Sequence, residues 1–273
     1  MTEVNESRAP LGIDDVRARM AASGVSWPEP ILLATTGSTN DELEALAREG
    51  AAEGTVVVAD EQTHGRGRLD RTWASPPGAG LWMSALVRVG DVTPDRWSLL
   101  SLAAGLAAVD ALGRGCGVRA ELKWPNDVVV IAAACGGSDG PRKLGGILSH
   151  TVGPDGVILG IGLNVAMRSE DLPVPQASSV LLEGGDPDRA ALLVDLMAAL
   201  ATRVAQWRGS DPALMEDYRR ACSSIGRLVD IDLPDGHRVS GMVAGVDDDG
   251  HLLVSDGEAT ARITSGDVVH ATI

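Results

Sequence analysis

Apolar runs of two kinds alternate along the first two thirds of the chain. Short runs rich in β-branched and small apolar residues cover 55–59, 80–89 and 157–165, which is typical of strands. Between them, 39–50 has an apolar stripe at helical spacing, and 93–112 is a longer apolar run with many small residues. The pattern predicts strands and helices that alternate within one folded body.

The ends of the predicted helices carry sequence signals. The first helix has Thr39 and Glu42 at the spacing of a capping box, and Gly50 closes it. Two later helices open at Asp186-Pro187 and Asp211-Pro212, each with an aspartate cap and proline at the first helical position. These signals predict where the helices begin.

Turn signals mark two further regions. Strand-like pieces flank the turn Trp124-Pro125-Asn126-Asp127, and another strand is predicted over 142–150 after a loop at 132–142. From about Gly226 onward, about 48 residues form short strands with hairpin signals, which predicts a small β-barrel. Its turns are predicted at three Asp-Gly pairs: Asp235-Gly236, Asp249-Gly250 and Asp256-Gly257.

Composition narrows the class of protein. The 273 residues carry a formal net charge of −15 and 44% of them are hydrophobic, so we expect a globular chain that binds neither nucleic acid nor an anionic membrane surface. The start of the chain lacks a signal-peptide pattern, and no apolar run reaches the length of a membrane span. Three cysteines without C-x-x-C spacing indicate a reducing compartment. The sequence predicts a cytoplasmic protein without membrane contact.

Basic residues point to the candidate chemistry. Only Lys123 and Lys143 are lysines among the 23 basic residues, which indicates positions that require a compact, flexible ammonium group. The segment 62–73 follows a predicted strand and alternates glycines with arginines. Such a loop can approach a small anionic ligand closely and supply fixed cations to it. The alternative is a solvated turn whose arginines lie on the surface.

Five motifs, taken in order, closely resemble those of the biotin protein ligase family. Any one of them is weak evidence, whereas five in this order are specific, and the resemblance covers about residues 31–273. The motifs are Gly37-Ser38-Thr39-Asn40, Gln62 with Gly65-Arg66-Gly67-Arg68 and Arg71-x-Trp73, Lys123-Trp124-Pro125-Asn126-Asp127, Lys143-Leu144-Gly145-Gly146-Ile147-Leu148, and Gly160-Ile161-Gly162-Leu163-Asn164.

The resemblance implies an α+β fold. A mixed β-sheet packed with helices, as in class II aminoacyl-tRNA synthetases and biotin ligases, is followed by a small SH3-like β-barrel. The implied domains are an N-terminal lead-in at 1–30, a catalytic domain at 31–224 and the barrel at 225–273. The lead-in carries one predicted helix, around 14–22, and is too short for the DNA-binding domain of bifunctional family members. We therefore expect a ligase without a repressor function.

The implied reaction has two steps. Biotin and Mg-ATP give biotinyl-5′-AMP and pyrophosphate, and the activated carboxyl group then passes to a lysine of the biotin carboxyl carrier domain of a biotin-dependent carboxylase. Mg²⁺ accompanies ATP, biotin is a substrate, and no tightly bound cofactor is implied. The expected partners are biotin, ATP and the carrier domain, without nucleic acid or membrane. The oligomeric state stays open.

The resemblance also assigns residue roles. Lys143 and Arg68 are the expected catalytic residues, because their cations stabilise charge on the carboxyl group and the phosphates. Asp127 is the expected Mg²⁺ ligand, since hard oxygen donors suit that ion. The expected biotin contacts are Ser38, Thr39, Asn40, Gln62, Gly65, Arg66, Gly67, Arg68, Lys143, Gly145 and Gly146. The expected nucleotide contacts are Arg66, Arg68, Arg71, Lys123, Trp124, Asn126 and Asn164.

Some residues depart from the family pattern. His64 stands in the arginine loop where many relatives carry another residue, and we expect it to face solvent. Asp70 replaces a common glycine, and the loop at 132–142 is longer than the usual hairpin. Two alternatives remain. One is a lipoate or octanoate ligase or transferase, which shares the fold and the adenylate chemistry, and the other is a non-catalytic biotin sensor.

Overall fold

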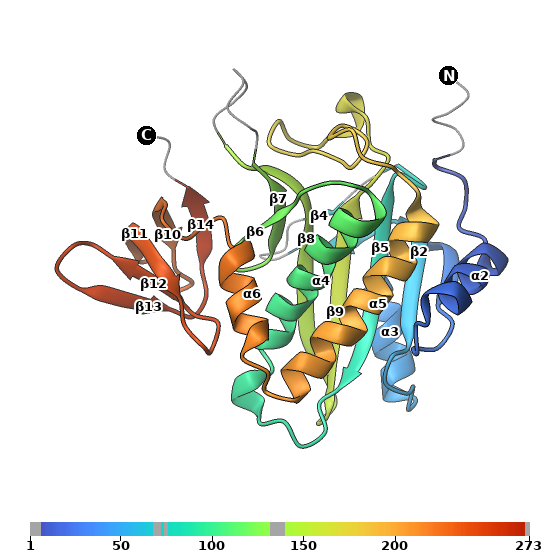
Figure 1. The fold of residues 1–273 in the computed structure, drawn as a ribbon, viewed down its shortest axis with the longest axis horizontal. Helices are drawn as coiled ribbons and strands as arrows, with labels where there is room; N and C mark the ends of the chain where they lie inside the picture. Colours follow the sequence, from blue (N-terminus) through green and yellow to red (C-terminus); the bar gives the residue numbers. More distant parts are fainter. Residues whose placement is uncertain (1–6, 68–71, 74–75, 132–139, 271–273) are drawn as a thin grey trace.

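The computed structural model describes residues 7–67, 72–73, 76–131 and 140–270. Figure 1 shows a larger unit, in which helices cover a central sheet, and a smaller all-β unit beside helix α6 (Ala213–Ala221). In chain order, the larger unit comes first and ends with α6, and the five strands of the smaller unit follow.

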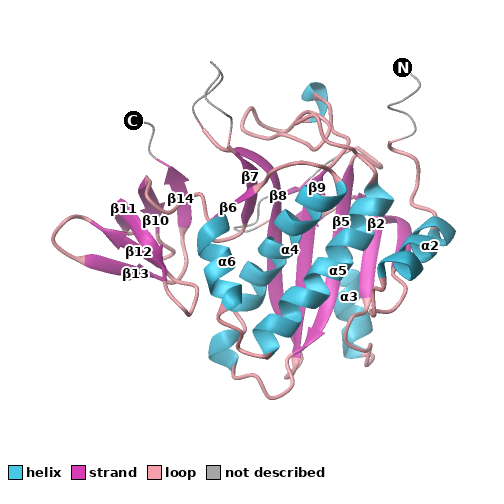
Figure 2. Cartoon of the chain, in the orientation of Figure 1, coloured by secondary structure: helices cyan, strands magenta, loops and turns pink. Residues whose placement is uncertain are grey.

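The larger unit is built on a seven-stranded mixed sheet (Figure 2). β1 and β2 run parallel, and every other pair of neighbours is antiparallel. The expected α+β class is thereby confirmed. In spatial order the strands are β1 (Ile31–Thr36), β2 (Val56–Gln62), β5 (Gly80–Arg88), β9 (Gly156–Asn164), β8 (Arg142–Val152), β7 (Asp127–Val130) and β6 (Glu121–Lys123).

Helices cover both faces of this sheet. α4 (Leu99–Gly115) and α5 (Arg189–Arg208) lie together along one face, and α2 (Ile13–Ser23) packs against α5 (Figure 1). α3 (Thr39–Arg48) packs against β2, β5 and β9. Because the central strands are covered on both sides, β5 and β9 are buried at nearly every position, which explains their continuous apolar runs.

Side-chain alternation along β2 shows that α3 lies on the opposite face from α4 and α5. Val56 and Val58 belong to the large core under α4 and α5, whereas Val57 belongs to a separate buried cluster with Leu43 of α3. Successive strand residues point to opposite faces of a sheet. The α3 face therefore has its own small core, and the N-terminus of α3 is held at the end of β2.

One helix in the described part of the chain, α5, is long and apolar enough to cross a membrane by length and composition. This corrects the expectation that no apolar run reaches that length. In the fold, 61% of its apolar window is buried inside the protein, and α5 packs along α4. The apolar surface of α5 therefore packs inside the protein core.

The predicted helix starts are partly correct. The cap of α5 is Asp188 rather than Asp186, and its carboxylate accepts a hydrogen bond from the Ala190 N–H at 3.0 Å. Asp186 instead accepts a hydrogen bond from the Asp188 N–H at 3.2 Å, so it forms a turn just ahead of the helix. For α6, Pro212 rather than Asp211 is the N-cap residue, and Asp211 accepts a hydrogen bond from the Ala213 N–H at 3.0 Å from just ahead of the helix.

Two other helix predictions had different outcomes. The helix predicted around 14–22 is found as α2. The helix predicted over 93–112 is divided, because Pro94–Arg96 form a separate 3₁₀ turn, η2, and α4 begins only at Leu99. Many small buried residues on α4 allow it to lie close to the sheet, as a Cβ on Gly105 would come within 3.1 Å of Leu122.

The smaller unit is a five-stranded antiparallel sheet, as expected from the hairpin signals. The glycines of its three Asp-Gly pairs have φ angles of 85°, 83° and 101°, a backbone region that favours glycine. Its buried residues form one continuous core with the larger unit. In spatial order the strands are β13 (Thr260–Ile263), β12 (Leu252–Ser255), β11 (Arg238–Val246), β10 (Leu228–Asp232) and β14 (Asp267–His270).

Candidate active site

A cavity of about 480 Å³ lies over the sheet, between the N-terminus of α3, the strands β6–β9 and the loop that follows β9. It brings together most of the residues singled out from the sequence: Ser38, Thr39, Asn40, Gln62, Arg66, Gly67, Lys123, Trp124, Asn126, Asp127, Lys143, Gly146 and Asn164. Gly65 and Gly145 do not line it. Arg68 and Arg71 lie outside the described residues.

Glycines on β8 and β9 bring backbone close to this space. A Cβ on Gly160 would lie 2.4 Å from the side-chain oxygen of Asn40, so a side chain there would displace Asn40. A Cβ on Gly145 would lie 2.3 Å from the carbonyl oxygen of Gly162 on the neighbouring strand. Gly145 therefore allows β8 and β9 to pair closely, whereas Gly146 lines the cavity.

Hydrogen bonds with β2 hold the N-terminus of α3. Gln62 Oε1 accepts hydrogen bonds from the backbone N–H and the hydroxyl of Thr39, at 2.9 and 3.1 Å. The predicted capping box is wrong, because Ser38 rather than Thr39 is the N-cap residue and its side chain makes no capping hydrogen bond. The Glu42 carboxylate accepts a hydrogen bond from the Thr36 hydroxyl instead, at 2.6 Å. The backbone N–H of Thr39 has no acceptor within the helix, and Gln62 of β2, 23 positions away in the sequence, supplies one.

Ser84 completes this polar network, and sequence reasoning missed it. Its hydroxyl lies 2.7 Å from the Thr39 hydroxyl and 2.6 Å from Asn40 Oδ1, and the residue is fully buried. Asn40 in turn donates from Nδ2 to the carbonyl oxygen of Leu148 at 3.3 Å. The only sequence signal is one hydroxyl within the apolar run 80–89.

Both lysines of the chain lie beside one carboxylate. Lys143 Nζ forms an ion pair with Asp127 Oδ1 at 2.5 Å, with side chains 33% and 23% exposed. Lys123 stands directly opposite Asp127 in the β6–β7 pair. All three residues line the cavity, so two ammonium groups and one carboxylate are concentrated at its wall. The partial exposure leaves the Lys143 ammonium accessible to a ligand.

The two asparagines of the predicted nucleotide set have different environments. Asn126 donates from Nδ2 to the carbonyl oxygen of Ile147 at 3.0 Å, and its own carbonyl oxygen accepts from the Ile147 N–H at 2.8 Å, which joins the turn to β8. Asn164 donates from Nδ2 to the carbonyl oxygen of Ser178 at 2.8 Å. Its Oδ1 is buried and accepts no hydrogen bond from the described residues. A buried acceptor of this kind favours a ligand donor.

The described part of the arginine loop is a short hairpin. β3 (Gly65–Arg66) pairs with β4 (Thr72–Trp73). The half-exposed Arg66 forms an ion pair with Asp41 of α3, which holds the loop against the helix at the edge of the cavity. His64 is exposed, as expected. Asp70 and residues 132–139 lie outside the described residues.

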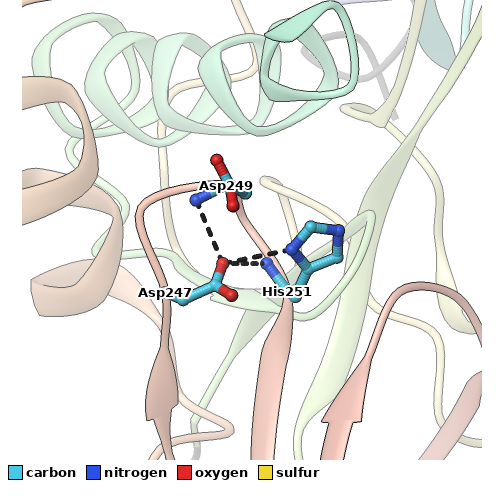
Figure 3. A group of neighbouring side chains, drawn as sticks. All are labelled: Asp247, Asp249 and His251. Atoms are coloured by element: carbon cyan, nitrogen blue, oxygen red, sulfur yellow. Dashed lines mark hydrogen bonds and ion pairs between the residues drawn. The ribbon is translucent and has the colours of Figure 1, made fainter. Parts of the chain in front are cut away.

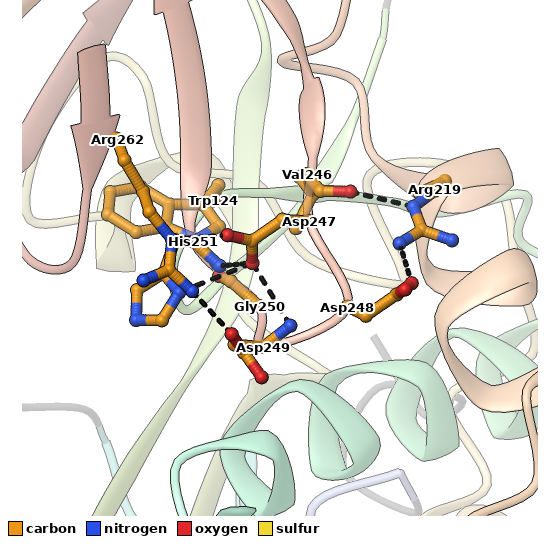
Figure 4. Close-up of polar contacts among 9 residues, drawn as sticks. All are labelled: Trp124, Arg219, Val246, Asp247, Asp248, Asp249, Gly250, His251 and Arg262. Atoms are coloured by element: carbon orange, nitrogen blue, oxygen red, sulfur yellow. Dashed lines mark hydrogen bonds and ion pairs between the residues drawn. The ribbon is translucent and has the colours of Figure 1, made fainter. Parts of the chain in front are cut away.

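Trp124 links the cavity wall to the smaller unit. The residue is 2% exposed, and its indole N–H donates to the carbonyl oxygen of Gly250 at 2.9 Å (Figure 4). Gly250 belongs to the β11–β12 turn and lies close to Leu99 and Leu102 of α4. The same turn borders a second cavity of about 600 Å³ that shares eight lining residues with the first, among them Arg66, Trp124 and Asn126. The smaller unit therefore supports one wall of the site.

Asp247 accepts the hydrogen bonds that hold the β11–β12 turn in its conformation (Figure 3). Its Oδ1 accepts hydrogen bonds from the Asp249 N–H at 3.0 Å and from the His251 N–H at 2.8 Å. Its Oδ2 accepts a hydrogen bond from Arg262 at 2.5 Å (Figure 4). Burial raises the pKa of Asp247, but the hydrogen bonds from Arg262 and His251 hold that pKa below its ordinary value. The acidic and imidazole groups of Asp247, Asp249 and His251 lie near one another, yet they are engaged within the turn, and we assign them a structural role.

Several apolar and amide side chains of the cavity were also missed from the sequence. The loop after β9 closes one end of the cavity next to Asn164, and it carried no recognisable signal. The missed lining residues include Trp82, Met83, Ile161, Met167, Pro173, Val174, Gln176, Ala177 and Val268.

Comparisons with known proteins all find similarity to the same family. A model of the Biotin/lipoate A/B protein ligase family matches residues 32–164, and a model of the Biotin protein ligase C terminal domain matches residues 224–271. The Biotin--[acetyl-CoA-carboxylase] ligase of Mycobacterium tuberculosis is 40% identical over 99% of each chain. The Bifunctional ligase/repressor BirA of Bacillus subtilis is 32% identical, with 85% of this chain and 70% of that protein covered.

The fold is also similar to that of a solved structure. The Biotin protein ligase from Aquifex aeolicus, in complex with biotin and ATP, has a TM-score of 0.74 to this chain and 25% sequence identity. The match covers 89% of this chain and 99% of that one, so it includes both the larger and the smaller unit.

Proposed function

Because this chain belongs to the biotin protein ligase family, we propose that its cavity holds biotin and the nucleotide end to end, with their reacting groups beside Lys143. The activity is that of an ATP-dependent biotin–[acetyl-CoA-carboxylase] ligase. A biotin carboxylate oxygen bonds to the α-phosphorus of ATP, and pyrophosphate leaves. The amine nitrogen of a carrier lysine then bonds to the activated carboxyl carbon, and AMP leaves.

The network at the α3 N-terminus supports the placement of the biotin rings. Gln62 uses its Oε1 to hold Thr39, so its amide N–H groups are the donors that it can offer a ligand. Ser38, Thr39 and Asn40 supply further polar atoms, and all three are almost fully buried. A ring system with a small polar edge and an apolar body fits a pocket with a few polar groups on an apolar lining.

The charges around Lys143 carry the proposal for catalysis. The first step brings a carboxylate against a triphosphate, and cations must offset the repulsion between these anions. Lys143, Lys123 and Arg66 line the cavity within one site. When the substrates bind, Lys143 leaves its ion pair with Asp127 and contacts the reacting oxygens. Arg66 likewise leaves its ion pair with Asp41 and contacts phosphate oxygens. Arg68 and Arg71 are expected to add positive charge from the arginine loop.

The carboxylate of Asp127 fits a magnesium ion that arrives with ATP. Mg²⁺ is usually held by one or two carboxylates together with substrate phosphates. Asp127 lines the cavity beside both lysines, and its ion pair with Lys143 uses Oδ1, so Oδ2 is the oxygen that would hold the ion. The ion would neutralise phosphate charge, while Asn126 keeps the turn that bears Asp127 fixed to β8.

The nucleotide is proposed to occupy the end of the cavity formed by Asn164 and the loop after β9. The buried Asn164 Oδ1 is an acceptor for an N–H or O–H donor, and both occur in adenosine. Met167 and Val174 give this end apolar surface for a flat ring. Trp124 lines the opposite wall, near the two lysines. The carrier domain is expected to bring its lysine to the same cavity in the second step.

A mass measurement tests the function. The protein is mixed with biotin, Mg-ATP and a biotin carboxyl carrier domain, and the intact mass of the carrier is read. We expect a biotin-sized gain that requires ATP and is absent when lipoate or octanoate replaces biotin. A gain with lipoate or octanoate alone would identify the related ligase class instead. Biotin binding without any gain would favour a sensor.

Ser84→Ala tests the network behind the biotin site. The change leaves Asn40 Oδ1 and the Thr39 hydroxyl without their buried partner, so we expect the free energy of unfolding to fall by about 1–3 kcal/mol. We also expect the dissociation constant for biotin to rise about tenfold, because Thr39 and Asn40 lose one hydrogen-bonding neighbour that fixes them. Denaturant unfolding and calorimetric titration measure the two effects.

The control for Ser84 is Thr202→Ala. Thr202 is on α5, and its hydroxyl donates to the carbonyl oxygen of Ala198 at an exposed position. We expect this change to leave biotin binding unaltered. Equal biotin affinity in the Ser84 and Thr202 variants would contradict a supporting role for Ser84.

A further inference from the structure

The segment Ser7–Leu11 lies ahead of the region that the family model matches, which begins at residue 32. Its backbone is neither helix nor strand. Its polar atoms nevertheless contact parts of the larger unit that are far away in sequence, and one of these parts is the loop that closes the cavity. Arg8 makes the contacts with that loop.

Arg8 binds the loop at two points. Its Nε and Nη2 donate to the carbonyl oxygen of Ala166 at 3.0 and 2.7 Å, and Nη2 forms an ion pair with Asp171 at 2.5 Å. Asp171 ends the 3₁₀ turn η3 (Ser169–Asp171) and also accepts from the Arg168 N–H at 2.8 Å. Only 22% and 15% of the Arg8 and Asp171 side chains are exposed, so solvent screens this pair less than a surface pair.

Ala166 connects this contact to the cavity. Its N–H donates to the carbonyl oxygen of Ala79 at 2.8 Å, while its carbonyl oxygen accepts from Arg8, so both sides of the residue are held. The next residue, Met167, lines the cavity and packs with Ala79 and Trp82 in a small buried cluster. A shift of Ala166 would therefore move a side chain of the cavity wall.

The segment Ser7–Leu11 is itself held by contacts with α5 and with the turn just ahead of β5. Arg189 is buried at the start of α5 and donates to the carbonyl oxygen of Ala9 at 2.6 Å and to Asp60 at 2.8 Å. The chain also passes close to Gly78, where a Cβ would lie 2.3 Å from the carbonyl oxygen of Arg8. Gly78 has a φ of +68° and leaves room for this approach.

We propose that Ser7–Leu11 stabilises the loop after β9 at one end of the cavity, with Arg8 as a positioning residue for the nucleotide. The inference rests on the proposed function, because Asn164 and Met167 form the end of the cavity that we assign to the nucleotide. Arg8 touches neither substrate. It fixes the loop that carries Met167, and biotin at the other end, beside Thr39, is held by elements that Arg8 does not contact.

Arg8→Ala is compared with Arg17→Ala. Arg17 is a matched control, because it also lies before residue 32 and forms ion pairs with Asp14 and Glu29, but it does not contact the loop. For Arg8→Ala we expect the KM for ATP to rise about tenfold, the effect of losing hydrogen bonds from one charged group. We expect the KM for biotin to stay within about twofold, since only one end of the cavity changes. Arg17→Ala should change neither.

Amide hydrogen exchange gives a second readout that does not depend on activity. We expect faster exchange over 166–172 in Arg8→Ala, and no change there in Arg17→Ala. Equal increases in the KM values for ATP and biotin would overturn the proposal, as would faster exchange without an effect on ATP. If the wild-type protein formed no adenylate, the proposed function would fail. Unchanged exchange in Arg8→Ala would instead refute the proposal that Arg8 stabilises the loop after β9.

Discussion

Lys143→Ala is expected to reduce the rate of biotinyl-adenylate formation by about 10²–10³-fold and to leave the fold intact. The variant removes the ammonium group that is placed to offset charge where the carboxylate meets the α-phosphate. Stability should change little, because the Lys143–Asp127 pair is partly exposed and such pairs contribute modestly. Single-turnover formation of the adenylate, with pyrophosphate release, measures the effect.

Arg142→Ala is the matched control for Lys143. Arg142 is the preceding residue on β8, its ion pair is with Glu183, and it does not line the cavity. Neighbouring strand residues point to opposite faces, so this change removes a cation from the same strand without touching the site. We expect adenylate formation within about twofold of wild type for Arg142→Ala, because neither Arg142 nor its partner Glu183 lines the cavity. Full activity in Lys143→Ala would refute its catalytic role.

Arg189→Ala is expected to lower the free energy of unfolding by about 3–5 kcal/mol, because it breaks a buried ion pair and leaves one charge unpaired. The Arg189 side chain is 2% exposed and pairs with Asp60, which is 15% exposed. Arg189 also donates to the carbonyl oxygens of Gly80 and Ala9, at 3.2 and 2.6 Å. The variant therefore leaves three acceptors at the junction of α5, β5 and the N-terminal segment without their donor.

Urea unfolding of Arg189→Ala is measured beside Arg48→Ala. Arg48 is 71% exposed and pairs with Glu44 one turn away on α3, so its loss should cost less than about 1 kcal/mol. A difference of less than about 1 kcal/mol between the two variants would contradict the role given to Arg189. Arg189→Ala should also expose the N-terminal segment to proteases, since Ala9 loses its contact.

Local sequence signals predicted local structure well. The Asp-Gly turns of the smaller unit and six of the seven strands of the large sheet were predicted, because turn backbones and apolar runs depend on neighbouring residues. The edge strand β1 was not predicted. The capping box at Thr39 failed for the opposite reason. The acceptor for the Thr39 N–H comes from Gln62, on a strand that meets the helix only in the folded chain.

Most residues of the candidate site that were predicted belong to the motifs, and most that were missed lie outside them. The motifs supplied both lysines, Asp127 and Asn164, and the structure places them around one cavity. Ser84 was missed, because a hydroxyl inside an apolar strand shows no sign of which partners it meets. The loop after β9 was missed as well, since its contacts with Arg8 join residues more than 150 positions apart.

The placement of the two lysines has a chemical consequence for the protein itself. A mixed anhydride that leaves the cavity acylates primary amines in its surroundings. Outside the cavity, every basic side chain of this chain other than histidine is an arginine, whose guanidinium remains protonated and is a poor nucleophile. The lysine amines are Lys123 and Lys143, both at the cavity wall. The side chains of the outer surface thus resist acylation by the enzyme's own intermediate.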